Sequence, residues 1–557
     1  MSSDSHARGA TEPPLIAQTI GDFFDAMAAR QPQREALVSR HEDVCLSYRE
    51  LQSRSRRLAS ALLRAGLAPG DRIGIWSHNN TAWVLMQIAT AQAGLILVNI
   101  NPAYRTAEVE YALGKVGCRA LVAMPRFKSS DYLAMLRELG AAKLPQLQRI
   151  WWIDRPGDAD EPVFDIPLGR FSALLESGDA ADPRVAGVQA GLRASDPINI
   201  QFTSGTTGFP KGATLTHRNI LNNGFFVGEC MRLAPEDRLC IPVPMYHCFG
   251  MVLGSLACLT HGSAIVFPSD GFDALAVLET VQAERCTALH GVPTMFIAEL
   301  EHPRFAEFDL STLRTGIMAG TACPIEVMRR VVERMHLAEI TIAYGMTETS
   351  PVSCQSSAGT PLDKRVTTVG TVQPHLEVRI VDPESGAAVA RGTAGELCTR
   401  GYSVMHGYWG DPQKTAEAID DDGWMHTGDL ATMDAQGYVN IVGRIKDMVI
   451  RGGENVYPRE IEEFLYGHPK IQDVQVVGVP DRRYGEELCA WIVPKPGQAL
   501  AEDEVRAFFQ GRIAHYKVPK YIRFVDAFPM TVTGKIQKFK IRDVMRAQLG
   551  IDEEKTA

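Results

Sequence analysis

The sequence contains no long uninterrupted apolar run, no paired-cysteine motif and no excess of basic residues. No window approaches the roughly 18 apolar residues of a membrane-spanning helix, so we expect no membrane span. The 57 basic residues are outnumbered by 66 acidic ones, for a net charge of −9, which argues against nucleic acid as a partner. A small anionic ligand stays compatible with this charge, because a local basic patch can oppose the overall sign.

The 11 cysteines are scattered singly, without a Cys-x-x-Cys pair or a cysteine–histidine cluster at metal-binding spacing. Such a set is typical of reduced thiols, most of them small buried side chains. The N-terminal residues lack an apolar core and carry Asp4 and Glu12, so we expect no secretory signal. The final EEKTA is no peroxisomal address. We therefore expect a cytoplasmic location.

A chain of 557 residues predicts two or three domains. Through the first 345 residues, short apolar runs alternate with amphipathic helical patterns, which predicts α/β architecture with mostly parallel sheets covered by helices on both faces. The predicted strands are Arg72–Trp76, Leu95–Ile100, Ile198–Phe202, Leu239–Val243, Ala264–Phe267, Ala288–Val292, Thr315–Ala319 and Ile340–Ala343. The predicted helices include Thr81–Ala93, Thr106–Val116, Phe272–Glu284 and Pro324–Met335.

The pattern changes after Gly345. Strands at Leu376–Val381, Glu396–Arg400 and Tyr438–Val442, joined by Gly- and Asp-rich turns, predict a β-rich subdomain. From Arg444 a further compact pattern predicts a separate small α+β domain. Its elements are helices at Pro458–Tyr466 and Glu502–Gln510 and strands at Val474–Val479, Leu488–Val493 and Tyr521–Val525. The predicted domains are 1–443 and 444–557.

The strongest chemical signal is Thr203-Ser-Gly-Thr-Thr-Gly-Phe-Pro-Lys-Gly212, directly after a predicted strand. Glycines let backbone N–H groups surround an anion, hydroxyls add donors and a lysine adds positive charge. The spacing matches neither the Walker nor the Rossmann pattern. We predict a phosphate-binding loop rather than a flexible turn, with Thr203, Ser204, Gly205, Thr206, Thr207, Gly208 and Lys211 as its binding residues.

Together with Pro244-Met-Tyr-His-Cys-Phe-Gly-Met251 and Tyr344-Gly-Met-Thr-Glu-Thr-Ser-Pro-Val352, this loop resembles the adenylate-forming superfamily. That superfamily contains AMP-forming acyl-CoA synthetases, peptide-synthetase adenylation domains and firefly luciferase. The resemblance extends from about residue 20 to 545 and is greatest to the fatty acyl-CoA synthetases, with the medium-chain type called acyl-CoA synthetase family member 2 as the nearest branch. It implies that the chain uses ATP, Mg²⁺ and CoA to convert a carboxylic acid into an acyl-CoA.

The second motif offers a flat aromatic face for a purine and a hard carboxylate oxygen for Mg²⁺. The resemblance implies that Tyr344 stacks on adenine, with Gly345 and Met346 beside it, that Thr347 contacts the α-phosphate and that Glu348 holds the metal. A polar turn is the alternative.

In Thr427-Gly-Asp429, an ionised carboxylate can accept two hydrogen bonds from a ribose diol. A bare Thr-Gly-Asp is most often a surface turn. The resemblance implies instead that Asp429 binds the 2′- and 3′-hydroxyls and that Arg444 assists.

The C-terminal domain contributes the hinge and a catalytic lysine by the same resemblance. Lys446 falls on the hinge position, and Gly452, Gly453 and Glu454 follow it on the CoA side. Lys535, in a Thr-Gly-Lys turn, is expected to stabilise the charge that develops during adenylation. Without the resemblance, this lysine would be read as a solvated side chain.

The acyl pocket is predicted from an apolar, aromatic stretch and a run of small residues. The resemblance places His247 at the acyl site, although a core histidine is the alternative. The other predicted acyl-side residues are Phe249, Gly250, Met318, Ala319, Gly320 and Thr321.

Competing activities share the scaffold. We expect a medium-chain fatty acid as substrate, with an aryl or short branched acid as the alternative. A carrier-protein-loading enzyme is less favoured, because Tyr246-His-Cys-Phe lacks the aspartate typical of amino-acid adenylation and no carrier domain follows. Nothing in the sequence demands the oxygen chemistry of a luciferase, and a regulator without catalysis would be expected to lack Lys535 or Glu348. The sequence does not decide the oligomeric state, for which a homodimer is one candidate.

Overall fold

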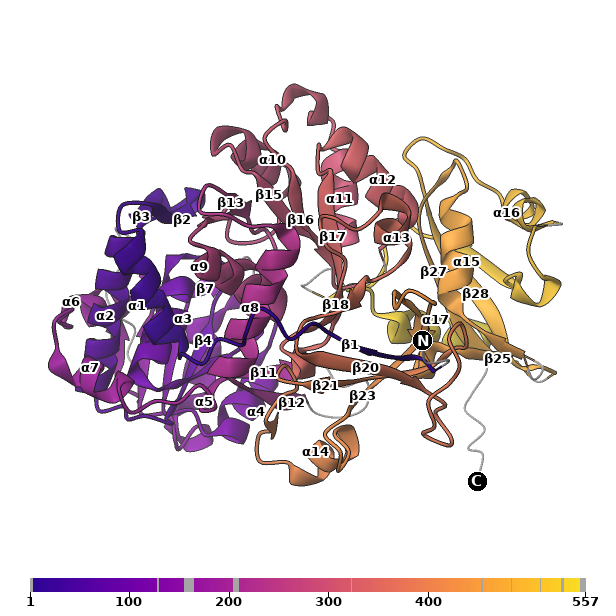
Figure 1. Ribbon diagram of the computed structural model, residues 1–557. Helices are drawn as coiled ribbons and strands as arrows, with labels where there is room; N and C mark the ends of the chain where they lie inside the picture. Colours follow the sequence, from indigo (N-terminus) through magenta and orange to yellow (C-terminus); the bar gives the residue numbers. More distant parts are fainter. Residues whose placement is uncertain are drawn as a thin grey trace.

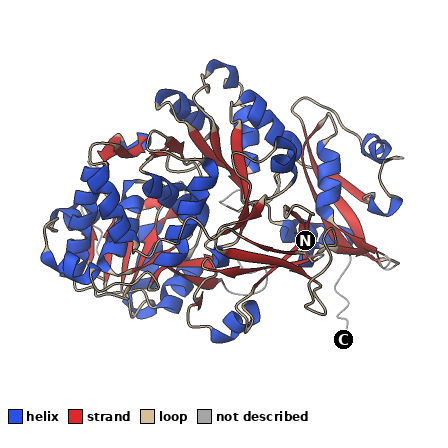
Figure 2. Ribbon diagram, viewed as in Figure 1, coloured by secondary structure: helices blue, strands red, loops and turns tan. Residues whose placement is uncertain are grey.

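The chain folds into two parallel sheets, an antiparallel sheet and a small C-terminal domain (Figure 1). The computed structural model describes residues 4–127, 130–154, 165–203, 210–321, 323–451, 454–481, 483–510, 512–531 and 535–550. Helices cover both sides of the parallel sheets (Figure 2).

The first parallel sheet has eight strands among the described residues and ends in two antiparallel strands. In spatial order they are β10 (Leu168–Arg170), β9 (Arg149–Trp152), β6 (Ala120–Ala123), β4 (Arg72–Trp76), β5 (Ile96–Asn99), β11 (Pro197–Thr203), β12 (Lys211–Thr216) and β22 (Gly407–Tyr408). β11 and β12 are therefore neighbours that lie on either side of the predicted phosphate loop.

The second parallel sheet has nine strands within the described ranges, with antiparallel strands at both edges. The order is β19 (Thr371–Val372), β18 (Val352–Gln355), β17 (Glu339–Gly345), β16 (Thr315–Ala319), β15 (Ala288–Gly291), β13 (Arg238–Cys240), β14 (Ala264–Phe267), β2 (Glu35–Ser39) and β3 (Val44–Ser47). The C-terminal ends of β16 and β17 carry the predicted acyl-side and adenine-side motifs, as expected for parallel α/β sheets.

The largest apolar core lies between these two sheets and contains residues of both. Helix α3 (Thr81–Ala93) is buried along its whole length, as expected for a helix that is apolar on all sides. Asn80 caps its start by accepting a hydrogen bond from the N–H of Trp83, and Gly94 ends it in the left-handed conformation. A buried π-helix over Phe249–Leu256 contributes to the same core.

The remaining helices surround the sheets or cover the smaller domains. They are α1 (Ile20–Arg30), α2 (Tyr48–Arg64), α4 (Thr106–Val116), α5 (Tyr132–Lys143), α6 (Phe171–Glu176), α7 (Pro183–Gln189), α8 (His217–Met231), α9 (Ala257–His261), α10 (Ala274–Ala283), α11 (Pro293–Leu300), α12 (Ile325–Arg334), α13 (Leu362–Thr367), α14 (Pro412–Ala418), α15 (Pro458–Tyr466), α16 (Glu502–Phe509) and α17 (Lys538–Leu549). A two-stranded ribbon joins β7 (Arg126–Phe127) to β8 (Ser130–Asp131).

The antiparallel sheet lies between the parallel sheets and the C-terminal domain. Its strand order is β1 (His6–Arg8), β20 (Leu376–Val381), β21 (Gly395–Gly401), β23 (Met425–Met433) and β24 (Val439–Arg444). The N-terminal strand β1 therefore pairs with a strand more than 350 residues away (Figure 1), which the sequence analysis did not predict.

The C-terminal domain has its own sheet and its own apolar cluster. The sheet consists, in the part of the domain that is described, of β26 (Glu454–Val456), β25 (Val449–Arg451), β28 (Gly485–Pro494), β27 (Ile471–Asp481) and β29 (Tyr521–Phe524). Helix α15 packs on β27, as the predicted helix and strand pattern required.

Most of the predicted strands have ends that differ by one to three residues in the structure, and for two of them the neighbouring chain explains the difference. The strand predicted at Ile340–Ala343 extends through Gly345, because Tyr344 pairs with Cys354 of the antiparallel strand β18. The strand predicted at Leu239–Val243 ends at Cys240, and the chain then leaves the sheet toward the π-helix. The predicted strand Arg72–Trp76 and helices Thr81–Ala93 and Thr106–Val116 are confirmed residue by residue.

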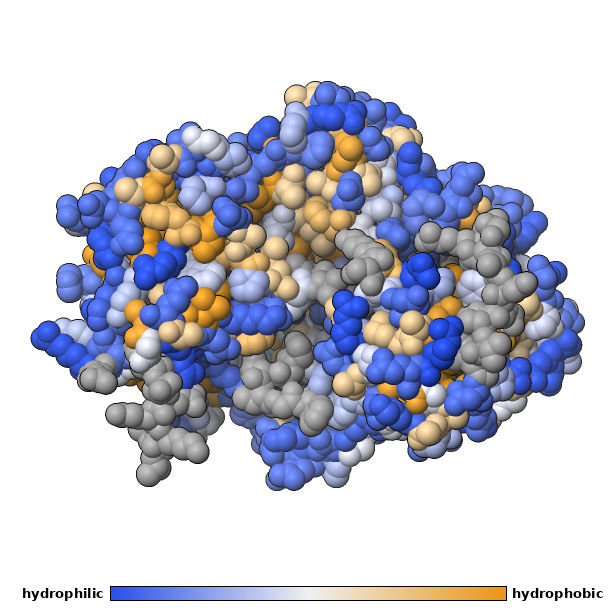
Figure 3. Space-filling model, turned by 180° about the vertical axis from the view of Figure 1, so that it is seen from behind, coloured by the Kyte–Doolittle hydropathy of each residue, from blue (hydrophilic) through white to orange (hydrophobic). Residues whose placement is uncertain are grey.

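In the ranges that the structure describes, none of the helices combines the length and apolar character needed to cross a membrane. Seen from behind, polar side chains cover most of the surface and apolar ones gather in separate groups (Figure 3).

Candidate active site

Asp429 lies at the centre of a hydrogen-bonded group contributed by three strands. The Tyr344 hydroxyl on β17 donates to Asp429 Oδ2 at 2.7 Å, and Arg444 Nε at the end of β24 donates to Oδ1 at 3.1 Å. Burial raises the pKa of Asp429 above its ordinary value, while the guanidinium and the phenol act in the opposite direction. A carboxylate has about four lone-pair positions, so these two donors leave room for a diol.

Glu348, which follows β17, is the centre of a second hydrogen-bonded group that includes Tyr408 on β22. Its side chain is 5% exposed, and its Oε1 accepts a hydrogen bond from the Tyr408 hydroxyl at 2.8 Å. Lys211 Nζ donates to the same hydroxyl at 2.9 Å and lies 4.1 Å from the centre of the Tyr408 ring. The tyrosine therefore connects the lysine of the predicted phosphate loop to the predicted metal-binding carboxylate.

Lys535 enters this site from the C-terminal domain and is half-buried there. Burial is the main cause that lowers its pKa below that of a free lysine, and the Arg444 guanidinium lowers it further. The carboxylates of Asp429 and Glu348 act in the opposite direction and raise this pKa, so both predicted nucleotide-binding acids interact electrostatically with the ammonium.

His247, which is predicted for the acyl side, lies two residues before the π-helix. Its Nδ1 accepts a hydrogen bond from the Phe249 N–H at 3.2 Å, and burial together with Lys535 lowers its pKa to about 3. The imidazole is therefore neutral near pH 7, with its proton on Nε2. Gly250 is required by close packing, because a Cβ atom there would lie 2.5 Å from the Pro244 carbonyl oxygen.

The end of β16 supplies the small residues predicted for the acyl side. Ala319 packs in the core between the sheets together with Phe249, whereas Met318 packs in the outer cluster beneath α12. Adjacent strand residues point to opposite faces, so the two side chains diverge. Gly320 has a φ of +93°, a conformation that favours glycine, and Thr321 follows it.

The remaining predicted residues divide into described and undescribed ones. Thr203 ends β11, and its hydroxyl lies 3.4 Å from the Lys211 carbonyl oxygen. Gly345 ends β17, with Met346 and Thr347 directly after it. Lys446 lies on an exposed turn after β24, and exposed Glu454 begins β26. The predicted residues that lie outside the described ranges are Ser204, Gly205, Thr206, Thr207, Gly208, Gly452 and Gly453.

Contacts between the C-terminal domain and the helices of the second parallel sheet hold the C-terminal domain in this orientation. Gln472 Nε2 on β27 donates to Glu301 Oε2, beside α11, at 2.7 Å. The N–H of Ile325 at the start of α12 donates to Glu463 Oε2 at 3.5 Å. A cavity of about 350 Å³ between α12, α13, β24 and α15 lies beside these contacts.

Sequence reasoning missed two residues of this site. Tyr408 lies in Gly407-Tyr-Trp-Gly410, an aromatic pair between glycines that could have indicated a constrained turn. Cys248 lies in the Pro244–Met251 motif, for which the sequence predicts no separate role of the cysteine. Its buried thiol donates a hydrogen bond to Gln201 Oε1 at 3.2 Å, and burial raises the pKa of this thiol to about 12. The polar Gln201 in an apolar strand was the available signal.

Comparisons with known proteins give a consistent assignment. Residues 24–409 match the family described as AMP-binding enzyme, and residues 460–535 match the AMP-binding enzyme C-terminal domain. The chain is 47% identical over 543 residues to the putative acyl-CoA synthetase YngI of Bacillus subtilis (strain 168), covering 95% of this chain and 97% of that protein. It is 46% identical over 567 residues to the mitochondrial medium-chain acyl-CoA ligase ACSF2 of Homo sapiens, covering 98% and 91% respectively.

Solved structures share the whole architecture. The anthranilate CoA ligase AuaEII in complex with anthranoyl-AMP superposes with a TM-score of 0.87 at 25% identity, covering 99% of this chain and 100% of that one. ATP-bound MatB from Rhodopseudomonas palustris gives a TM-score of 0.77 at 28% identity, covering 94% and 99%.

Proposed function

The chain belongs to the AMP-binding enzyme family, and from this premise we propose that it is an ATP-dependent acid–CoA ligase that forms an acyl-adenylate intermediate. The observation that supports this most directly is the electrostatic interaction of Lys535 with Asp429 and Glu348, because it brings the field of a cation from the C-terminal domain to the predicted nucleotide site. The names of the relatives, acyl-CoA synthetases and ligases, agree with it.

The nucleotide is held by both groups of residues. We propose that Asp429 and Arg444 hold the ribose, that Tyr344 lies against the adenine and that Lys211 and residues 203–208 bind the phosphates. Glu348 would hold a magnesium ion, because an almost buried carboxylate is the hard oxygen ligand that this ion prefers. When bound, the ion neutralises charge on the phosphates.

The first half-reaction is attack of a carboxylate oxygen on the α-phosphorus of ATP. The new P–O bond forms as the bond to the β-phosphate breaks, and pyrophosphate leaves with the electron pair. Lys535 offsets the negative charge that develops, and the neutral His247 offers Nε2–H to the acyl oxygen. We propose that this orientation of the C-terminal domain is the adenylating one.

The second half-reaction requires the domain to turn about Lys446, which withdraws Lys535 and brings the 452–454 segment to the site. The CoA sulfur then attacks the acyl carbonyl carbon, its proton passes to solvent, and AMP leaves as the C–O bond breaks. We also propose a domain boundary near residue 444. It is supported by the ends of the strands, because β24 ends at Arg444 and the C-terminal sheet begins at Val449.

We propose a medium-chain fatty acid as the acyl donor, in keeping with the name of the ACSF2 relatives. The alternative is an aryl acid, which the similarity to an anthranilate CoA ligase favours. The buried side chains of Phe249 and Ala319 are apolar, which suits an apolar acyl chain.

ATP–pyrophosphate exchange over a panel of octanoate, benzoate and isobutyrate, with and without CoA, tests both levels of the proposal. We expect the fastest exchange with octanoate, and acyl-CoA plus AMP when CoA is added. Preference for benzoate would overturn the substrate class alone. Cleavage of ATP to ADP, or no ATP binding, would overturn acyl-adenylate formation.

Two finer points are proposed with it. We propose a cytoplasmic location, in keeping with 11 scattered cysteines that are all free thiols, although the ACSF2 relatives are named mitochondrial. We also propose a homodimer. Cell fractionation and light scattering of the purified protein test these points.

A further inference from the structure

The strand that carries Asp429 does not match its neighbour residue for residue. Between β21 and β23, Glu396 pairs with Leu430 and Cys398 pairs with His426. A single residue of β21 therefore faces three residues of β23, namely Thr427, Gly428 and Asp429. Such bulges occur next to active sites, where they redirect a side chain.

Hydrogen bonds hold this bulge in one shape. The Thr427 hydroxyl donates to the Leu397 carbonyl oxygen at 2.6 Å and accepts from the Asp429 N–H at 3.1 Å. Gly428, with a φ of +70°, donates its N–H to Glu396 Oε1 at 2.9 Å. These contacts replace the ladder pairs with β21 that Thr427, Gly428 and Asp429 lack, whereas Asp429 still pairs with Arg444 of β24.

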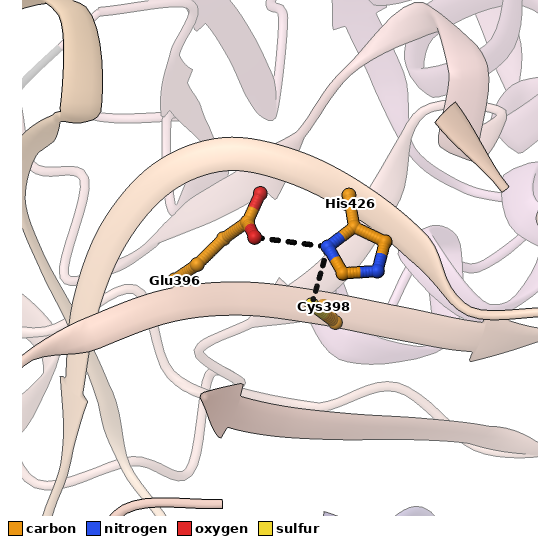
Figure 4. Close-up of side chains that lie close together, drawn as sticks. All are labelled: Glu396, Cys398 and His426. Carbon is orange, nitrogen blue, oxygen red and sulfur yellow. Dashed lines mark hydrogen bonds and ion pairs between the residues drawn. The ribbon is translucent and has the colours of Figure 1, made fainter. Parts of the chain in front are cut away.

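Glu396 is the side chain that ties the start of the bulge to its middle. Its second oxygen, Oε2, lies 2.9 Å from His426 Nδ1 (Figure 4), so one carboxylate accepts from the residue before the bulge and from its middle. Glu396 is 9% exposed, and it does not reach the nucleotide residues itself.

Glu396, Cys398 and His426 are also ligand types for transition metals, and their polar atoms lie within 4.8 Å of one another. The contacts favour a hydrogen-bond network over a metal centre. Both Glu396 oxygens already accept hydrogen bonds from N–H groups, those of His426 and Gly428. The other ring nitrogen of His426 faces Asp420 at 3.7 Å.

We propose that Glu396 is a positioning residue for ribose recognition: by clamping His426 and Gly428 it holds the bulge so that Asp429 faces the ribose hydroxyls. This inference rests on the proposed function, because it assumes that Asp429 binds the ribose of ATP. The carboxylate of Glu396 acts through the backbone of the bulge and touches no substrate.

The test compares ATP with 2′-deoxy-ATP, because only ribose recognition changes the ratio of their kcat/KM values in pyrophosphate exchange. A lost hydrogen bond to a charged group predicts that the wild-type enzyme prefers ATP by about 10- to 100-fold. Glu396→Ala should reduce this ratio below about threefold, and Asp429→Ala should bring it near one. In a double mutant, the effect of Glu396→Ala on the ratio should vanish.

Two further variants separate positioning from general damage. Glu396→Gln keeps a carbonyl oxygen for the Gly428 N–H and should retain most of the preference. Glu377→Ala removes a carboxylate of β20 that pairs with Arg8 and Arg400 in the same sheet, and it should leave the ratio unchanged. If Glu396→Ala does not fold, Thr427→Val removes a second bond of the bulge and should lower the ratio in its place.

The outcomes are distinguishable. Equal losses with both nucleotides in Glu396→Ala, or additive effects on the ratio in the double mutant, would show a merely structural role and overturn the inference. A wild-type enzyme that lacks any exchange with ATP would overturn the proposed function instead. Calorimetric titration with AMP and 2′-deoxy-AMP provides the same ratio without turnover.

Discussion

Removing the ammonium of Lys535 should separate the two half-reactions. Lys535 reaches the nucleotide site from the C-terminal domain, where burial lowers its pKa and the carboxylates of Asp429 and Glu348 favour its charged form. The second half-reaction is proposed to occur with this lysine withdrawn. Lys535→Ala should therefore slow adenylation and leave thioester formation from supplied acyl-AMP nearly unchanged.

The size of the loss follows from the position of the charge. A half-buried ammonium acts through an effective dielectric constant of about 20, and at about 4 Å from a unit of developing negative charge it contributes roughly 4 kcal/mol. At about 1.4 kcal/mol for each factor of ten, adenylation should fall about 1,000-fold. The pKa of Lys535 is lowered, so its ammonium loses a proton at a lower pH than that of a free lysine does. The wild-type adenylation rate should therefore decline as the pH rises through this pKa.

Pyrophosphate exchange measures the first half-reaction, and thioester release from synthetic acyl-AMP and CoA measures the second. Lys540→Ala is the matched control, since it removes an exposed lysine of α17 in the same domain. It should change neither rate by more than about twofold. Equal losses of both half-reactions in Lys535→Ala would refute the proposed division between the two domain orientations.

Three other changes test single contacts of the site. Tyr408→Phe removes the hydroxyl that connects Lys211 to Glu348, and kcat/KM for MgATP should fall about 10- to 100-fold; an unchanged value would contradict this connection. His247→Gln should lower the rate without moving the acid limb of the pH–rate profile above pH 5, because a pKa of about 3 keeps the imidazole neutral there. Gln472→Ala breaks a contact with Glu301 that exists in this domain orientation, and it should slow exchange about two- to fivefold while sparing thioester formation from acyl-AMP.

Much of the fold could be predicted from the sequence, because the buried strands and helices of the parallel sheets have simple local signals. Thr81–Ala93 is mostly apolar and carries no charged residue, begins after a capping asparagine and ends at a glycine, so its limits depend on adjacent residues alone. The strand through Tyr344 was predicted too short because its last residues are held by a neighbouring antiparallel strand. Pairing between distant segments, such as β1 with β20, has no comparable local signal.

The candidate site could be predicted in part for a similar reason. Asp429 and Glu348 lie in motifs whose order along the chain resembles that of the adenylate-forming superfamily, so the sequence predicts a role for both. Tyr408 lies in no such motif. Its position depends on the pairing of β22 with β12, which brings the Tyr408 hydroxyl between Lys211, nearly 200 residues earlier, and Glu348, 60 residues earlier.

Glu396 shows most clearly what remains hidden until the strands are paired. In the sequence it is one acidic residue before an apolar run, and nothing nearby indicates a function. Once β21 and β23 are aligned, three residues must fit opposite one, and Asp429 lies in this excess backbone, paired with Arg444 of β24 and hydrogen-bonded to Tyr344. A regular ladder would send alternate side chains to fixed faces of the sheet. The position of Asp429, the carboxylate proposed to bind the ribose, therefore depends on a mismatch between two strands, and the residue that stabilises the mismatch matters as much as the motif that contains Asp429.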